Sequence, residues 1–152
     1  MSVEVRPATL ADLPYILAAD ETAEREERRY DYISGAIGGD HGRSIKVLIL
    51  DDELVGFAVM GEFFGHPFLE LIATSPHVRR RGVASALMAN LEVNLQDDRM
   101  FVSTNESNDI MRQLLVKRGY RVSGMVENLD PGDPELFFVI FKSFIDTQIE
   151  LG

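Results

Sequence analysis

A strand-like segment is joined to a helix-like segment by a short loop of arginines and a glycine in the middle of the sequence. Residues 67–74, PFLELIAT, have the apolar composition of a strand. Beyond Gly82, a valine and three leucines recur every four residues, which predicts a helix to about residue 96. The loop places three consecutive arginines, 79–81, directly before Gly82. The chain must therefore turn tightly at this glycine and present the N-terminus of a helix beside the end of a strand.

The whole chain predicts strands and helices in the order βααββ followed by βαβαββ, without an internal repeat, a linker or a second domain. Strands are expected at residues 3–7, 43–50, 54–64, 99–104, 120–126 and 135–144. Helices are expected at 10–20 and 108–119, an exposed helix or a loop at 21–33, and a glycine-rich loop at 34–42. This order predicts an α/β fold with a mixed sheet, formed as a single domain over residues 1–152.

Composition limits the classes of function. The 152 residues include no cysteine, which excludes disulfides, thiolate metal sites and a cysteine nucleophile. Asp and Glu number 25 against 15 Lys and Arg, so the net charge of −10 disfavours nucleic acid and favours a cationic substrate. The longest apolar run, Leu136–Phe141, is too short to span a membrane, and no signal peptide is recognised. We therefore expect a cytoplasmic protein with no membrane partner.

The loop at Gly82 has the arrangement of a phosphate-binding site. Backbone N–H groups at a helix N-terminus, together with the helix dipole, attract anions, and a glycine lets the anion approach closely. Neither the P-loop pattern G-x-x-x-x-G-K-[ST] nor the dinucleotide pattern G-x-G-x-x-G is present. The alternative is that the arginines form a solvated surface and that Gly82 is a simple turn residue. Local spacing leaves both interpretations open.

Three separated features together resemble the GNAT family of N-acetyltransferases. RRRGVA, from Arg79 to Ala84, fits the acetyl-CoA loop pattern Q/R-x-x-G-x-G/A of that family. The opening VRPATLADLPYI is typical of the family's first strand and helix. Asn108 and Gly119 match the spacing of a later family helix. The resemblance implies a mainly antiparallel sheet of six to seven strands, flanked by about four helices, whose fourth and fifth strands splay apart.

The resemblance also implies acetyl-CoA as co-substrate and assigns residues to it. The diphosphate would bind the N–H groups of residues 81–85, and the pantetheine arm would pair with the end of the fourth strand. Asn108 would meet the cofactor from the fifth-strand side, and the first two arginines would reach the ribose phosphate. The complete predicted set is Ile72, Ala73, Thr74, Arg79, Arg80, Arg81, Gly82, Val83, Ala84, Ser85 and Asn108.

Acetyl transfer to an amine requires a base, since only the neutral amine attacks the thioester. Some family members that acetylate polyamines carry a glutamate on the fourth strand nine residues before the loop's first arginine, and Glu70 has this position. The resemblance therefore implies Glu70 as the catalytic base. The alternative is that Glu70 alternates with Leu69 and Leu71 and lies on the solvent face of a strand.

The sequence departs from the family where the acid is expected. Many relatives carry a tyrosine four residues before the helix-ending glycine, and Leu115 stands there instead. Tyr120 is expected in the core, and Ser103 stands where other relatives place a base on the fifth strand. Water or another tyrosine would then protonate the thiolate, unless acid catalysis is dispensable. A different possibility is a catalytically silent module that binds or senses acyl-CoA.

The acceptor is expected to be a small-molecule or peptide amine. Glu21, Glu24, Glu26 and Glu27 could line its pocket, or could be charges of an exposed helix. The acidic segment 126–135 could border the same pocket. The three histidines lack metal-ligand spacing, so no metal is expected. The apolar segment 135–144 could be a sheet edge that pairs in a homodimer, or a strand buried within the monomer.

Overall fold

The computed structural model describes residues 2–20 and 27–152, with the backbone alone at residue 27. Its strands are β1 (Val3–Pro7), β2 (Ser44–Leu50), β3 (Glu53–Phe63), β4 (His66–Thr74), β5 (Arg99–Asn105), β6 (Arg121–Val126) and β7 (Glu135–Phe141). Its helices are α1 (Leu13–Ala19), α2 (Glu27–Ile37), α3 (Val83–Val93), α4 (Asp109–Lys117) and α5 (Lys142–Leu151). Short 3₁₀ turns lie at Leu10–Asp12, Asp40–Gly42 and Pro76–Val78.

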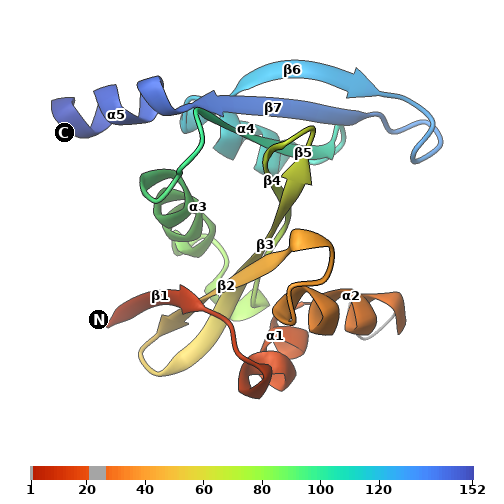
Figure 1. Cartoon of the computed structure of the whole chain (residues 1–152), viewed down its shortest axis with the longest axis vertical. Helices are drawn as coiled ribbons and strands as arrows, with labels where there is room; N and C mark the ends of the chain where they lie inside the picture. Colours follow the sequence, from red (N-terminus) through yellow and green to blue (C-terminus); the bar gives the residue numbers. More distant parts are fainter. Residues whose placement is uncertain (1, 21–26) are drawn as a thin grey trace. The chain divides into compact units, whose positions relative to one another are not determined.

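The strands form one seven-stranded sheet in the order β1-β2-β3-β4-β5-β7-β6 (Figure 1). The sheet is mainly antiparallel, and β4 and β5 run parallel. This confirms the predicted mixed sheet at the upper end of the expected strand number. The described residues form five α-helices instead of about four, because a helix follows the last strand.

Two segments differ from their sequence-based predictions. The strand expected at 135–144 ends at Phe141, and α5 begins at Lys142. Ile145 and Ile149 then recur at helical spacing, and Ile145 is buried. The glycine-rich loop expected at 34–42 is helical in its first part, because α2 continues to Ile37 and buries Ala36. In both places the apolar pattern of a short helix was hidden by neighbouring strand or loop signals.

The chain divides into two compact units whose boundaries fall within β3, β4 and α3. Unit 1 comprises Met1–Glu62 and Glu70–Leu91, and unit 2 comprises Phe63–Leu69 and Glu92–Gly152. The predicted single domain over residues 1–152 stays a prediction. The predicted splay of the fourth and fifth strands also stays a prediction. The part of β4 that would diverge from β5, Glu70–Thr74, belongs to unit 1, whereas β5 belongs to unit 2.

The core of unit 1 lies between two helices and two strands. It is formed by fully or almost fully buried apolar side chains from α1, α2, β2 and β3, namely Ile16, Ala19, Ile33, Ala36, Ile45, Val47, Phe57 and Val59. The helix expected at 10–20 is confirmed over α1 (Leu13–Ala19), which follows a 3₁₀ turn at Leu10–Asp12. The charged segment after it is helical from residue 27 onward, with one apolar face on the core.

Unit 2 contains an antiparallel layer of β5, β7 and β6, with α4 packed on one face (Figure 1). The start of β4 belongs to the same unit and pairs in parallel with β5. Every residue of β6 is exposed, and β6 forms the edge of the sheet. β7 pairs with β5 on one side and β6 on the other, and four of its apolar residues are buried within the monomer, namely Leu136, Phe138, Val139 and Ile140. The alternative that this strand is a dimerising edge is therefore wrong. None of the described helices is long and apolar enough to cross a membrane.

An ion pair fastens the start of the chain to its first helical turn. Arg6 of β1 donates to both carboxylate oxygens of Asp12, at 2.8 and 2.9 Å, and the backbone N–H of Thr9 donates to the same carboxylate at 2.8 Å. These donors, chiefly Arg6, lower the pKa of Asp12 from 3.8 to about 2. Because the folded-state pKa is depressed, this stabilisation is complete above about pH 4 and is lost as the pH falls toward 2.

We predict that Asp12→Asn lowers the free energy of unfolding at pH 7 by about 1–3 kcal/mol, measured by urea denaturation. The difference from wild type should shrink between pH 4 and pH 2. Glu4→Gln is the matched control, because Glu4 is exposed and lies 3.5 Å from Arg6 Nε. It should cost less than about 1 kcal/mol. An equal loss of unfolding free energy in the two variants at pH 7 would contradict a stabilising role for the Arg6–Asp12 ion pair.

Candidate functional site

The loop between β4 and α3 is fixed at both ends by backbone hydrogen bonds. The N–H of Ser75 donates to the Val55 carbonyl on β3 at 2.8 Å, which holds the end of β4. The Gly82 carbonyl accepts the N–H of Ala86 at 2.9 Å, which begins the helix. Arg80 and Gly82 have φ angles of +67° and +79°. The left-handed conformation costs glycine little, so Gly82 is suited to the turn that starts α3.

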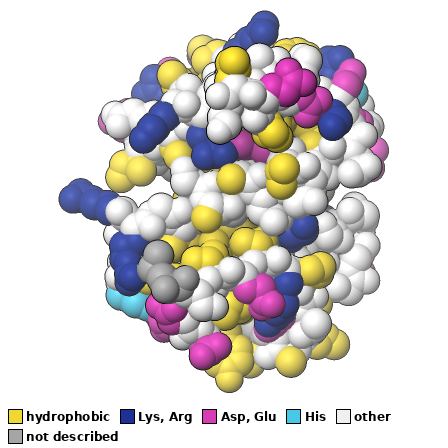
Figure 2. Space-filling model, turned by 90° about the vertical axis from the view of Figure 1, so that its left-hand side faces the viewer, with side chains coloured by type: hydrophobic (Ala, Val, Ile, Leu, Met, Phe, Trp, Pro, Cys, Tyr) yellow, Lys and Arg dark blue, Asp and Glu magenta, His cyan; other side chains and the backbone are white. Residues whose placement is uncertain are grey.

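The N-terminus of α3 faces open space. The first N–H groups of a helix, here those of Val83 and Ala84, have no carbonyl within the helix to bond. A Cβ built at Gly82 would meet nothing within 4 Å. The arginines of the loop are exposed, and on the face drawn in Figure 2 basic side chains are interspersed with acidic ones. This arrangement can bind an anion, as the loop sequence predicts.

Not every predicted donor of the loop is equivalent. The N–H of Arg81 donates to the Val78 carbonyl at 3.2 Å, so it closes the preceding turn. Arg79 and Arg80 are exposed, as a role at the ribose phosphate would require. The donors that lie in the first turn of α3 begin at Val83, and they are the better candidates for a diphosphate.

Gly56 on β3 sets the position of α3 against the sheet. A Cβ at this residue would lie 2.9 Å from Val83 Cγ1, 3.2 Å from Leu87 Cδ1 and 3.3 Å from the Ala73 carbonyl oxygen. Only glycine leaves room for both the helix and the neighbouring strand. The first turn of α3 is thereby held directly over the sheet, next to the loop.

The predicted pantetheine contacts and Asn108 belong to different units. Ile72, Ala73 and Thr74 are partly exposed at the end of β4 in unit 1. Asn108 lies in unit 2, where its Oδ1 accepts the N–H of Met111 at 3.1 Å and caps α4. The cap gives Asn108 a structural role that the spacing to Gly119 did not reveal. Its predicted contact with the cofactor stays a prediction.

Glu70 lies in a polar cluster with side chains from α2 and from the residue before β2. The Tyr32 hydroxyl donates to Glu70 Oε1 at 2.9 Å, and Arg43 Nε donates to the two carboxylate oxygens at 2.9 and 3.1 Å. The Glu70 side chain is only 17% exposed. The alternative that Glu70 lies on the solvent face of the strand is therefore wrong. Leu71, the next residue, packs against the core formed by α1, α2, β2 and β3.

Two features hold this carboxylate in position. A Cβ built at Gly61 would overlap the Glu70 carboxylate, so the glycine provides its space. Burial, and then the adjacent Glu70 charge, raise the pKa of the Tyr32 hydroxyl well above 10, which keeps it a donor at neutral pH. Tyr32 and Arg43 were missed by the sequence analysis, because they lie 38 and 27 residues from Glu70 along the chain.

The residues considered for the acid are buried. Leu115 is fully buried, and Tyr120 is 4% exposed, as expected of core residues. The Tyr120 hydroxyl donates to Glu92 Oε2 at 2.8 Å, and Arg118 donates to both oxygens of the same carboxylate. Burial, reinforced by Glu92, raises the pKa of Tyr120 far above 10. Tyr120 therefore stabilises unit 2 and cannot readily supply a proton.

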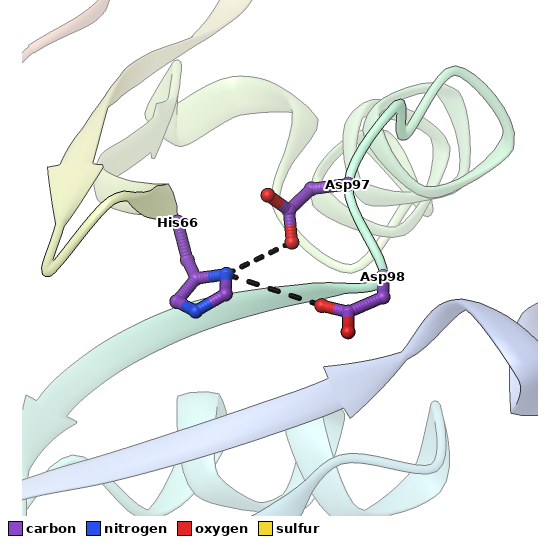
Figure 3. A group of neighbouring side chains, drawn as sticks. All are labelled: His66, Asp97 and Asp98. Atoms are coloured by element: carbon purple, nitrogen blue, oxygen red, sulfur yellow. Dashed lines mark hydrogen bonds and ion pairs between the residues drawn. The ribbon is translucent and has the colours of Figure 1, made fainter.

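His66, Asp97 and Asp98 form a cluster that sequence spacing did not indicate (Figure 3). Nδ1 of His66 lies 2.9 Å from Asp97 Oδ1 and 3.9 Å from Asp98 Oδ1. Potential ligand atoms of the three residues lie within 4.8 Å of one another, close enough for one cation. Arg99, however, donates to both oxygens of Asp98 and lowers the pKa of Asp98 to about 2. A metal ion at this cluster would compete with the Arg99 guanidinium for the Asp98 carboxylate. The expectation that the protein binds no metal stays a prediction.

The acidic segment after β6 is attached to the end of β5. Asn105 donates to Asp130 at 2.9 Å, and the Ser107 hydroxyl donates to Asp133 at 2.6 Å. Ser103 of β5, where relatives place a base, hydrogen-bonds Glu135 of β7. Of the other acidic residues expected near the acceptor, Glu21, Glu24 and Glu26 and the side chain of Glu27 lie outside the described residues.

Comparison with known proteins identifies relatives over nearly the whole chain. Residues 10–120 match the model of the acetyltransferase (GNAT) family. A GNAT-family acetyltransferase from Bacillus cereus is 37% identical, with a TM-score of 0.83, over 93% of this chain and 99% of the other. No curated protein sequence matches this chain.

More distant structures share the fold. The ribosomal-protein-S18-alanine N-acetyltransferase of Escherichia coli is 17% identical, with a TM-score of 0.76, over 92% of this chain and 94% of the other. A GNAT-family acetyltransferase from Elizabethkingia anophelis, solved with acetyl-CoA bound, is 14% identical, with a TM-score of 0.72, over 91% of this chain and 97% of the other.

We predict that Gly56→Ala lowers the free energy of unfolding by about 1–3 kcal/mol, because the new methyl group overpacks against Val83. Gly38→Ala is the control, since a Cβ there finds its nearest atom at 3.5 Å, an ordinary contact. Urea denaturation measures both variants. Gly56→Ala with the stability of wild type would refute the close packing of α3 on β3.

Proposed function

Because the chain belongs to the acetyltransferase (GNAT) family, we propose that it transfers the acetyl group of acetyl-CoA to a primary amine. The observation that carries this proposal is the N-terminus of α3, where Gly82 opens the first helical turn to solvent beside the end of β4. A helix N-terminus with adjacent arginines is complementary to a diphosphate. The acetyl-CoA bound to the related Elizabethkingia protein supports the same co-substrate here.

In this proposal the acetyl-CoA diphosphate binds the backbone from Gly82 to Ser85, and Arg79 to Arg81 surround it. The pantetheine arm pairs with the backbone of Ile72 to Thr74, and Asn108 contacts it from β5's side. The amine and acetyl-CoA are bound together, and the amine attacks the thioester directly. The partial exposure of the residues at the end of β4, and the open space around Gly82 at the start of α3, support these roles.

Glu70 is the proposed base. One proton of the ammonium passes to the Glu70 carboxylate, and the free amine then attacks the carbonyl carbon. A C–N bond forms, the C–S bond breaks, and the second proton reaches the departing CoA thiolate through water, because Leu115 offers no acid. Arg43 and Tyr32 hold the carboxylate in one orientation, which supports a role that depends on position.

A second candidate function is an acyl-CoA-binding module without turnover, favoured by the buried leucine at position 115. A thiol-release assay with acetyl-CoA and a panel of polyamines, amino acids, arylalkylamines and N-terminal peptides separates the two. Amine-dependent release of CoA supports the transferase. Calorimetric binding of CoA without release by any amine supports the binding module instead.

We predict that Arg81→Glu combined with Gly82→Asp abolishes CoA binding in calorimetry, because two carboxylates then face the diphosphate. Arg28→Glu, which reverses the charge of an exposed arginine on α2, is the control away from the loop and should bind CoA as wild type does. Unchanged affinity of the double variant would refute the diphosphate site.

We predict that Glu70→Gln lowers kcat/KM by about 10²–10⁴-fold across the pH range, since the amide cannot accept the proton. Tyr32→Phe removes one hydrogen bond to Glu70 and keeps the carboxylate, so its loss should be much smaller. Full activity of Glu70→Gln over the whole pH range would exclude Glu70 as the base.

A further inference from the structure

One face of the unit 2 sheet carries a cluster of phenylalanine rings that is only half buried. Phe63 at the end of β3 lies at its centre, with ring centroids 5.3 Å from Phe68, 5.3 Å from Phe101 and 5.2 Å from Phe137. Phe68 is stacked on Phe137 with an interplanar angle of 14°. All four side chains are partly exposed. We call these four residues the phenylalanine face.

This face lies opposite the one that α4 covers. Cross-strand pairing places Phe101 opposite Val139 and Phe137 opposite Ser103, so these residues share a face of the sheet. Leu136 and Phe138 alternate with Phe137 along β7 and therefore point to the opposite face, where they lie beside residues of α4. The phenylalanine face is therefore a separate surface, on which several aromatic rings are left accessible.

An exposed phenylalanine extends this surface at the β3–β4 turn. Phe64 is 89% exposed, has a φ of +49°, and packs edge-on against Phe63 at 4.8 Å. A bulky residue is unfavourable in the left-handed conformation, and an exposed ring gains nothing from burial. Within the protein its ring contacts Phe63, and its remaining surface is available to an apolar group of a ligand.

A carboxylate lies at the end of the phenylalanine face. Glu135 is two residues before Phe137 on β7, on the same face of the strand, and its side chain hydrogen-bonds Ser103 of β5. Burial raises the pKa of Glu135; the Ser103 hydrogen bond opposes this, and the charges of Asp130 and Asp133 add to it. Both aspartates are held there by Asn105 and Ser107. Negative charge is thus concentrated beside the aromatic rings.

We propose that this surface binds the acceptor, and that the acceptor is a primary amine carrying an aromatic or bulky apolar substituent. The rings of Phe63, Phe64 and Phe137 contact the substituent, and Glu135 pairs with the ammonium group. Charge complementarity selects the cation, and the aromatic face selects its apolar part. The inference rests on the proposed acetyl transfer, and in it Glu135 binds the ammonium group of the acceptor.

The experiment measures binding of 2-phenylethylamine and butylamine to the full-length protein loaded with CoA, by calorimetry, and thiol release with acetyl-CoA. Wild type should bind 2-phenylethylamine more tightly than butylamine. Glu135→Gln should weaken both amines by about tenfold or more and raise KM more than it lowers kcat. Glu127→Gln, an exposed residue of the same acidic segment, is the matched control and should leave both affinities unchanged.

Phe64→Asn tests the aromatic part without endangering the fold. Asparagine accepts the left-handed backbone, so this variant should unfold no more easily than wild type. It should nevertheless reduce the preference for 2-phenylethylamine over butylamine about three- to tenfold, the value of one aromatic contact. Thermal unfolding of the same preparation shows whether a change in amine preference is accompanied by a loss of stability.

The outcomes distinguish this inference from the proposed function. Acetylation of other amines, with no preference for 2-phenylethylamine and no effect of Glu135→Gln or Phe64→Asn on amine affinity, would overturn the inference and leave acetyl transfer intact. Selective binding of 2-phenylethylamine that depends on Glu135, without thiol release by any amine, would support the surface and refute the transferase. Absence of binding of either amine to the CoA-loaded protein would overturn the inference.

Discussion

The close approach of α3 to β3 at Gly56 is the constraint on which the candidate cofactor site depends. With no side chain at residue 56, Val83 and Leu87 lie directly over the strand, and the Ala73 carbonyl of β4 lies beside them. The first turn of α3 is thereby fixed next to the end of β4, where Ser75 is tied to Val55. The dipole of α3, the glycine at its start and the arginines before it then act at one place.

An acidic protein can bind an anionic co-substrate where its positive potential is confined to one place. The net charge of −10 would repel acetyl-CoA at long range, yet backbone N–H groups and three exposed arginines at the start of α3 are attractive at short range. Elsewhere, carboxylates are held by specific partners: Glu70 by Arg43 and Tyr32, and Glu92 by Arg118 and Tyr120. The same charge balance favours a cationic amine as the second substrate.

Local signals in the sequence predicted most of the fold. The four-residue spacing after Gly82 predicted α3, and Gly119, with a φ of +95°, ends α4 as expected. The end of a strand or helix was harder to predict where no glycine or proline marks it. The apolar run of β7 masked the start of α5 at Lys142, where only the change to helical spacing marks the boundary.

The candidate site was predictable where it is contiguous in sequence and unpredictable where it is assembled by folding. The loop from Arg79 to Ala84 is a single segment, so its pattern was recognisable. The partners of Glu70 come from α2 and from the residue before β2, and their contacts depend on the space left by Gly61. Ser103 and Glu135 are brought together only by the pairing of β5 with β7, which no local pattern encodes.

The structure of the protein crystallised with CoA tests the central claim most directly. The account predicts the diphosphate within hydrogen-bond distance of the backbone N–H groups of Gly82 to Ser85, with the pantetheine arm beside Ile72 to Thr74. A CoA molecule bound elsewhere, or a loop whose N–H groups are filled by protein atoms while CoA is present in excess, would contradict it.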